Sequence, residues 1–172
     1  MPDAPGLELI RGEIEQNHPG AVLDTSFHRD QPALVVDPAQ ILAVLAWLSD
    51  APGQGYRFLS SLHAADYLPA QPRFAVHYEL LNRDRVERLR VKALLADPSD
   101  DALPEIDSCV ELFPTAEFQE REVYDFFGIV FKGHPHLTRI LLPEDYVGWP
   151  QRRDFPIGGE PVTFTYNERA YG

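Results

Sequence analysis

The sequence predicts an α+β fold, a two-layer sandwich in which helices cover one face of a mostly antiparallel sheet. Apolar residues recur at helical spacing in two early segments, and three long strand-like segments then follow one another. Prolines and glycines crowd the last third of the chain, where they disfavour regular structure. The predicted order is α-β-β-α-β-β-β, followed by a helix at about 115–127 and an extended C-terminal tail.

The first half of the predicted sandwich holds two helices and two short strands. Apolar residues at i, i+3 and i+7 predict a helix over residues 7–17, and strands are expected over 22–27 and 33–36. Asp37 is placed to cap the second helix, with Pro38 at its first position. Four residues then form the apolar face of that helix: Ile41, Val44, Leu45 and Leu48.

Three long strands complete the predicted sheet as an antiparallel meander. The first spans about 56–67, and the second alternates strictly over 74–81. A hairpin loop at 82–84 leads to the third, and Val86 is out of phase with the inward residues that follow. This phase break predicts a bulge near Glu87.

Between the meander and the last helix the sequence shows no clear helical or strand periodicity. Residues 97–107 are acidic and contain proline, so we expect an exposed loop, and residues 109–113 are compatible with one more short strand. The helix at 115–127 should end at Gly128, which suits a left-handed C-cap. We therefore divide the chain into a core domain, 1–128, and a Pro/Gly-rich docking tail, 129–172.

Composition restricts the classes of partner. The net charge is −12, and residues 1–128 hold 10 Lys and Arg against 22 Asp and Glu. Such an acidic body argues against nucleic acid and against anionic membrane surfaces as direct partners. The single cysteine, Cys109, excludes a disulfide framework and the ligand set of an iron–sulfur cluster. With no signal peptide pattern and no apolar run of membrane length, a cytoplasmic location is expected.

Charged residues on the helix at 115–127 fall at regular spacing. Glu117, Arg121 and Asp125 lie at i, i+4 and i+8 and predict one charge ladder. Glu122 and Asp125 are i, i+3 neighbours, which is also the arrangement of a carboxylate pair for acid–base chemistry. A salt-bridged surface of the helix is the simpler interpretation.

Glu120 is the exception, because it shares a helix face with the apolar residues. A carboxylate on a core face needs a partner. A bidentate arginine from the tail would satisfy it, and we name Arg139, Arg152 or Arg153 as that partner.

The tail after residue 129 carries more large aromatic residues than a disordered linker does. They should be buried against the body of the chain or against a partner: Tyr146, Trp149, Phe155, Phe164 and Tyr166. His134 and His136 form a His-x-His pair, but no third metal ligand suggests itself, and structural histidines are the simpler interpretation. No phosphate-binding glycine loop, nucleophile elbow or Cys/His pair occurs.

Residues 116–156 resemble the signature of the C subunit of respiratory complex I, the proton-pumping NADH–quinone oxidoreductase. Two positions depart from the family pattern, Gln151 in place of Leu and Arg153 in place of Lys. The matching residues are Ala116, Phe118, Glu120, Arg121, Glu122, Tyr124, Asp125, Phe127, Gly128, Ile129, Phe131, Gly133, His134, Pro135, Arg139, Ile140, Leu141, Pro143, Glu144, Gly148, Pro150, Arg152, Asp154, Phe155 and Pro156.

The resemblance implies a hydrophilic, peripheral-arm subunit on the cytoplasmic side of the membrane, attached to it only through the complex. It implies an oxidoreductase and translocase complex in which this chain is non-catalytic and carries no cofactor, cluster, flavin or quinone. The implied neighbour is the large D subunit, which helps to form the quinone pocket, and the signature residues together with Arg153 are the implied interface.

Three alternatives remain. The chain is also compatible with the equivalent subunit of a related complex: a membrane-bound hydrogenase, an F420H2 dehydrogenase or the photosynthetic NADH-dehydrogenase-like complex with its J subunit. In a different class, it would be a stand-alone acid–base or metal-dependent enzyme that uses Glu120, Glu122, Asp125, His134 and His136. A generic acidic adaptor is a third hypothesis. The quinone, the electron donor and the pumped ion are not encoded in any motif of this chain.

Overall fold

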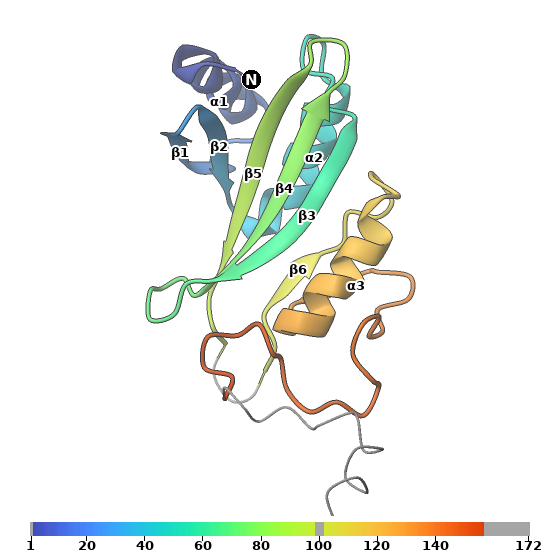
Figure 1. Ribbon diagram of the computed structural model, residues 1–172. Helices are drawn as coiled ribbons and strands as arrows, with labels where there is room; N and C mark the ends of the chain where they lie inside the picture. The colour runs from blue at the N-terminus through green and yellow to red at the C-terminus, as the bar shows by residue number, and fades with distance from the viewer. Residues whose placement is uncertain (1, 99–101, 157–172) are drawn as a thin grey trace, which may run out of the picture.

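A computed structural model describes residues 2–98 and 102–156 and confirms the α+β class. In the five-stranded sheet, β3, β4 and β5 lie in front of α2, α1 lies against β1 and β2, and α3 runs beside β3 (Figure 1). The elements in chain order are α1 (Ala4–Asn17), β1 (Val22–His28), β2 (Gln31–Val36), the 3-10 helix η1 (Pro38–Gln40), α2 (Ile41–Asp50), β3 (Phe58–Asp66), β4 (Phe74–Asn82), β5 (Glu87–Leu95), β6 (Glu105–Asp107), α3 (Ala116–Phe127) and β7 (Val130–Lys132).

The strand order of the main sheet is β1-β2-β5-β4-β3. The predicted meander β3-β4-β5 is antiparallel, and β1 and β2 form an antiparallel hairpin. The chain leaves β2 through α2 to the far edge of the sheet and builds the meander back toward β2. For this reason β2 and β5 meet as a parallel pair, which makes the sheet mixed but mostly antiparallel.

The core lies between the inner face of this sheet and the two N-terminal helices. α1 buries Leu7, Ile10 and Ile14, as their helical spacing predicts, and α2 buries all four residues of its apolar face. The inner residues of the strands belong to the same core, and buried residues of β6, α3 and β7 extend it. Each fully buried aliphatic side chain contributes about 1.5–3 kcal/mol relative to an exposed one.

Three local predictions are wrong. Residues 105–107 are not loop but β6, which pairs in parallel with β7 and buries Ile106. Residues 109–113 form a turn, closed by a hydrogen bond from the Phe113 N–H to the Cys109 carbonyl, instead of a strand. No bulge interrupts the β4–β5 ladder, because Val86 lies in the hairpin turn with a left-handed φ of 53°.

Helix α3 covers the free edge of the sheet. The Thr115 hydroxyl donates to the Leu59 carbonyl at 3.0 Å, and the Gln119 side-chain oxygen accepts the Leu62 N–H. Side chains of α3 thus satisfy backbone groups of β3 that would otherwise be open to another strand. The helix ends at Gly128, whose left-handed φ of 68° confirms the predicted C-cap.

Candidate functional site

Most residues of the predicted signature gather where the second half of α3 meets the segment 139–156. Figure 1 shows this segment, in orange and red, passing around the lower end of α3. Hydrogen bonds from its backbone and side chains run to the helix, to the helix C-terminus and to the β3–β4 hairpin. The candidate site is this junction, and each of its three attachments has its own chemistry.

Asp125 holds the first attachment. It is fully buried, and its Oδ2 accepts the N–H groups of three successive residues, Ile140, Leu141 and Leu142, at 3.0, 2.7 and 2.9 Å. Burial raises the pKa of such a carboxyl, but these three N–H groups and the Arg139 guanidinium together hold the pKa of Asp125 below its usual value. Asp125 is therefore an ionised anchor for the chain after β7.

Arg139 completes this attachment, which we call the Asp125 clasp (Asp125, Arg139 and residues 140–142). Its Nη1 donates to Asp125 Oδ1 at 2.7 Å and to the Asp125 carbonyl at 2.9 Å. Its Nη2 donates to the carbonyl oxygens of Tyr146 and Gly148, both at 3.1 Å, and the guanidinium lies 4.5 Å from the Trp149 ring. The planar Arg139 guanidinium thus ties both ends of the loop 139–149 to α3.

The second attachment caps the C-terminus of α3. The last carbonyl groups of a helix lack partners within the helix and carry partial negative charge. Here the Gln151 N–H donates to the Phe126 carbonyl at 3.2 Å, and Arg152 Nε donates to the Phe127 carbonyl at 2.7 Å. Trp149 lies against Gly128 so closely that a Cβ there would come within 2.5 Å of its ring.

The third attachment is a charged cluster that the sequence did not predict. Arg73, only 4% exposed, binds Asp66 through two nitrogens at 2.8 and 3.1 Å. The same guanidinium binds Asp97 at 2.8 Å and Asp154 of the signature at 2.7 Å. The Arg153 N–H also donates to Asp66. Burial opposes ionisation of Asp66, but these donors lower its pKa to about 2.

Glu120 does not have the predicted arginine partner. Its carboxylate is buried and accepts the Ser108 hydroxyl at 2.6 Å and the Cys109 N–H at 2.8 Å. Burial raises the pKa of Glu120. Arg139 and Arg152 are instead committed to Asp125 and to the helix C-terminus. No local pattern identifies Ser108 and Cys109, which lie twelve and eleven residues before Glu120, as its partners, although the helical spacing did place Glu120 on the core face.

The predicted charge ladder on α3 is also wrong. Arg121 turns toward the tail and donates to the carbonyl oxygens of Thr138 and Arg139, both at 3.1 Å. Asp125 is in the clasp, and Glu122 is exposed to solvent. The two carboxylates proposed as an acid–base pair therefore lie in different environments.

His134 closes the turn that leads into the tail. Its Nε2–H donates to the Glu117 carbonyl at 3.0 Å, and its Nδ1 accepts the His136 N–H at 3.0 Å. Both ring nitrogens are thus engaged by the backbone. Within residues 2–98 and 102–156, no three His, Cys, Asp or Glu side chains gather as metal ligands would.

The remaining signature residues pack around these attachments or face solvent. Tyr124 meets the Trp149 ring edge-on at 5.3 Å, and Tyr146 stacks on Phe155 at 6.3 Å between ring centroids. Phe155 approaches Gly148, where a Cβ would lie 2.7 Å from its ring. Phe127 is buried, Pro150 is half-buried, and several members are exposed: Glu122, Pro135, Glu144, Arg153, Asp154 and Pro156. Phe164 and Tyr166 lie outside the described residues.

Comparisons with known proteins agree with this signature. The family model described as respiratory-chain NADH dehydrogenase, 30 Kd subunit, matches residues 34–161. A protein of Herpetosiphon aurantiacus, named as the C subunit of NADH-quinone oxidoreductase, is 47% identical over 135 residues, covering 78% of this chain and 77% of the relative. A protein of the same name from Roseiflexus castenholzii is 43% identical over 159 residues, covering 92% and 89%.

A solved structure shares the fold. It is a chain of the membrane-bound sulfane sulfur reductase (MBS), an archaeal respiratory membrane complex, with a TM-score of 0.70 and 23% identity. The likeness covers 95% of this chain and 90% of that one. Among the helices in the described ranges, none has the length and apolarity needed to cross a bilayer.

Proposed function

The chain belongs to the family of the 30-kilodalton subunit of respiratory-chain NADH dehydrogenase, which includes the C subunit of NADH-quinone oxidoreductase, and from this we propose a non-catalytic assembly role in such a complex. In this role the chain is a hydrophilic subunit of the peripheral arm, on the cytoplasmic side of the membrane. It sits beside the large D subunit, which helps to form the quinone site, and electrons pass through other subunits.

The observation that carries this proposal is the way the signature residues are used. Asp125 and Arg139 direct their polar atoms to groups of the same chain, and so do Glu120 and His134. Arg152 does so through Nε alone, because its buried Nη2 has no hydrogen-bond partner among the described residues. Side chains whose polar atoms are hydrogen-bonded within the chain fix the conformation of its surface and are not free to react with a substrate. The same engagement weighs against the stand-alone enzyme hypothesis.

The shaped surface has apolar residues that the chain itself leaves exposed. Leu141 and Val147, both in the loop closed by the Asp125 clasp, are 61% and 88% exposed. Their neighbours Leu142, Tyr146 and Trp149 are half-buried. A loop held rigid from within binds a partner at lower entropic cost than a flexible one, which favours a docking role for residues 139–149.

A tagged copy of the chain, recovered from detergent-solubilised membranes, tests the proposed complex. Among the co-purifying proteins, identified by mass spectrometry, we expect the D subunit, with the other subunits of an NADH–quinone oxidoreductase. Recovery of hydrogenase subunits or of F420H2-oxidising subunits would support the related complex instead. A chain recovered alone from membranes and cytosol would overturn the assembly role.

Paired surface substitutions test the docking loop. Leu141→Asp combined with Val147→Asp places charges on the exposed residues of the loop, so we expect reduced recovery with the complex. Leu9→Asp combined with Leu23→Asp, at positions 70% and 57% exposed on α1 and β1, is the matched control with the same two added charges. All variants should unfold at the wild-type temperature, and equal recovery of the loop variant and the control would contradict docking through this loop.

A further inference from the structure

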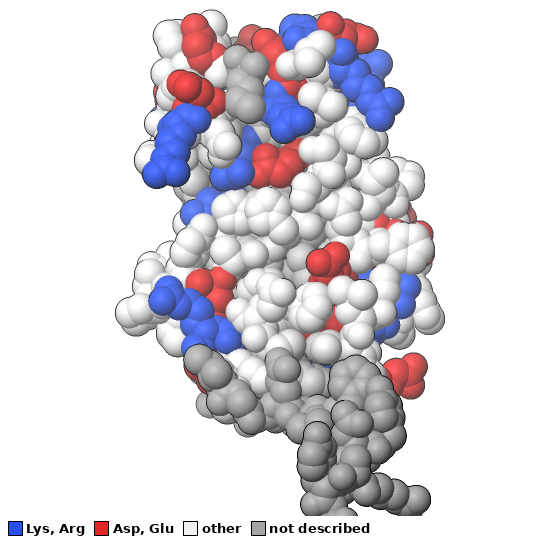
Figure 2. Space-filling view, in the orientation of Figure 1, with Lys and Arg blue, Asp and Glu red and all other residues white. Residues whose placement is uncertain are grey.

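The face of the main sheet opposite α1 and α2 is locally basic, although the protein as a whole is acidic. Cross-strand partners place Arg90 beside Glu79, and Lys92 beside His77, on this outer face. Arg88 lies in the same row of β5, opposite Leu81. Three cations thus face one carboxylate, on a body whose Asp and Glu outnumber its Lys and Arg by 22 to 10. Figure 2 shows this face: charged groups gather toward the end with the β4–β5 turn, and the middle is largely uncharged.

A groove of about 240 Å³ lies on this face, across β2, β3, β4 and β5. Seven residues line it: Gln31, Pro32, Ser60, Ser61, Glu79, Arg88 and Arg90. Its volume is below the roughly 300–1,000 Å³ typical of pockets that enclose small-molecule ligands. The size suits a single side chain from another polypeptide.

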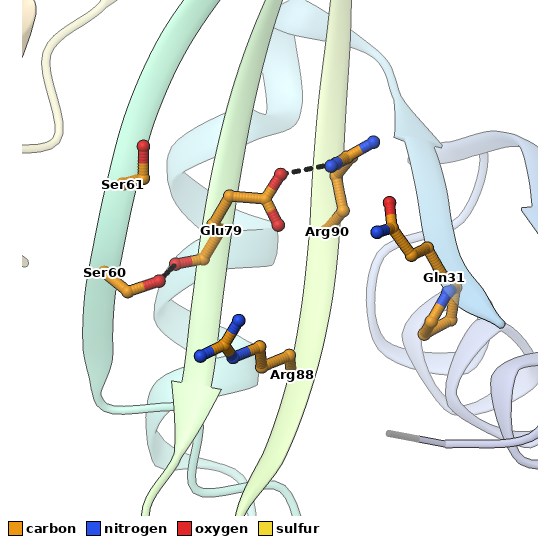
Figure 3. A pocket seen from close by; sticks show the side chains of 7 residues that line it. Gln31, Ser60, Ser61, Glu79, Arg88 and Arg90 are labelled. Atoms are coloured by element: carbon orange, nitrogen blue, oxygen red, sulfur yellow. Dashed lines mark hydrogen bonds and ion pairs between the residues drawn. The ribbon is translucent and has the colours of Figure 1, made fainter. Parts of the chain in front are cut away.

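The polar groups of the groove are not equivalent. Glu79 is neutralised by Arg90 Nε, and its backbone carbonyl accepts the Ser60 hydroxyl at 2.8 Å (Figure 3). Gln31 reaches toward Arg90 from β2, and Arg88 lies across β4 toward Ser60. Arg88 is exposed and forms no ion pair with any residue of 2–98 or 102–156. The one carboxylate present is therefore already matched, while a second guanidinium is available.

We propose that this groove receives an Asp or Glu side chain from an acidic segment of a neighbouring polypeptide, with the Arg88 guanidinium as its ion-pair partner. Arginine binds a carboxylate through two parallel N–H groups. The Gln31 amide is a further donor on the other side of the groove, beside Arg90 (Figure 3). The overall charge of −12 disfavours nucleic acid, whose continuous phosphate charge would extend over the acidic body beyond the groove. This surface is separate from the docking loop 139–149, and the groove does not depend on it.

Binding to a defined probe tests the groove on the isolated full-length chain. A hexaglutamate peptide is titrated into the ¹⁵N-labelled protein at constant ionic strength, with hexalysine and inorganic phosphate as comparison probes. We expect saturable amide shifts at Gln31, Ser60, Ser61 and residues 88–90 with hexaglutamate alone. Shifts scattered elsewhere, or none, would overturn the proposal, and equal shifts with phosphate would show a general anion site instead.

Charge-reversed variants give the matched comparison. Arg88→Glu should weaken hexaglutamate binding about tenfold or more, the equivalent of about 1.4 kcal/mol. Arg11→Glu makes the same change of charge on α1, where Arg11 pairs with Glu8 at 3.6 Å, and should leave binding within about twofold. An equal loss of hexaglutamate affinity in both variants would show that binding depends only on the net charge of the protein, and would contradict a specific site.

A photo-cross-linking residue at Gln31, in the membrane complex, tests the groove in its assembly. We expect a cross-link to a peptide of another subunit that contains Asp or Glu. If the chain joins the complex but no such cross-link forms, the groove assignment fails while the assembly role stands. If the chain joins no complex yet binds hexaglutamate through Arg88, the assembly role fails while the groove assignment stands.

Discussion

The Asp125 carboxylate and the Arg139 guanidinium meet at 2.7 Å beneath the tail, with Asp125 fully buried. Their separation in sequence is fourteen residues, and between them the chain forms β7 and the turn closed by His134. Arg139 also holds the carbonyl groups of Tyr146 and Gly148. One ion pair thus fixes the path of residues 139–149.

Replacing Arg139 with alanine should strongly destabilise the protein. The change leaves a buried carboxylate without its cation and two carbonyl groups without donors, so we expect a loss of about 3–5 kcal/mol in the free energy of unfolding. Arg121→Ala removes an arginine that contacts the same tail from the partly exposed side of α3, and should cost about 1 kcal/mol. Urea unfolding curves measure both, and equal losses would show that the clasp is no stronger than a surface contact.

Gly128→Ala should destabilise the protein more than Gly133→Ala. Both glycines have left-handed φ angles, 68° and 82°, so both changes carry a similar backbone strain of about 1 kcal/mol. A Cβ at Gly128 also meets Trp149, whereas at Gly133 nothing lies within 4 Å. We expect an additional cost of about 1–3 kcal/mol at Gly128.

A thermal unfolding series measures this difference, and Trp149→Leu supplies its control. In the Trp149→Leu background the two glycine variants should become nearly equal, because the ring that crowds position 128 is gone. An unchanged difference in that background would show that Trp149 is not the cause.

Substitutions of Glu120 should separate its hydrogen bonds from its charge. Glu120→Ala leaves the buried Cys109 N–H without an acceptor and should cost about 1–3 kcal/mol. Glu120→Gln can accept from Cys109 and donate to Ser108, and it removes a charge that burial disfavours. Because burial raises the pKa of Glu120, wild-type stability should fall as pH rises above the ordinary glutamate pKa.

The two Glu120 variants are compared with the wild type by urea unfolding across the pH range 4 to 8. Glu120→Gln should be at least as stable as the wild type at pH 8 and should lose less stability as the pH rises. A glutamine variant as unstable as the alanine variant at pH 8 would show that the ionised carboxylate itself is required.

His77 should make the protein acid-sensitive. Burial lowers its pKa to about 3, and the neighbouring His63, Lys92 and Arg90 add to the effect. The unfolded chain takes up a proton near pH 6.5 that the folded state refuses, so stability should fall between about pH 6.5 and 3. The slope for one proton is at most about 1.4 kcal/mol per pH unit.

His77→Gln should flatten the pH dependence in that window, whereas His28→Gln, at an exposed position on β1, should leave it unchanged. Chemical unfolding at half-unit steps of pH measures both. An unchanged slope in the His77 variant would assign the acid sensitivity to other groups.

Much of the secondary structure could be predicted because its signals are local. The alternation over β4 and β5 sets which side chains face inward, and the helical spacing on α1 and α2 does the same. Gly128 ends α3 as expected, because a left-handed C-cap favours glycine. The spacing of the signature likewise identified the family without any knowledge of contacts.

Several of the errors share one cause, which is pairing between segments that lie far apart in the chain. Ile106 belongs to β6 because Phe131 of β7 pairs with it, and no periodicity in an acidic segment reveals that. Arg73 meets Asp66, Asp97 and Asp154 from three separate segments, so its role depends on how those segments pack. Glu120's face was predicted, but its partners were not.

The sequence by itself determined the order of α1, α2, α3 and the five strands of the main sheet, the end of α3 and the family of the chain, since these depend on residue types at short, regular spacing. The tertiary structure decided which groups bind one another: Asp125 with Arg139, Glu120 with Ser108 and Cys109, and Arg73 with three aspartates. Several arginines and carboxylates in this chain are chemically equivalent as donors and acceptors. Only the packing of β3, α3 and the tail brings particular pairs within hydrogen-bonding distance.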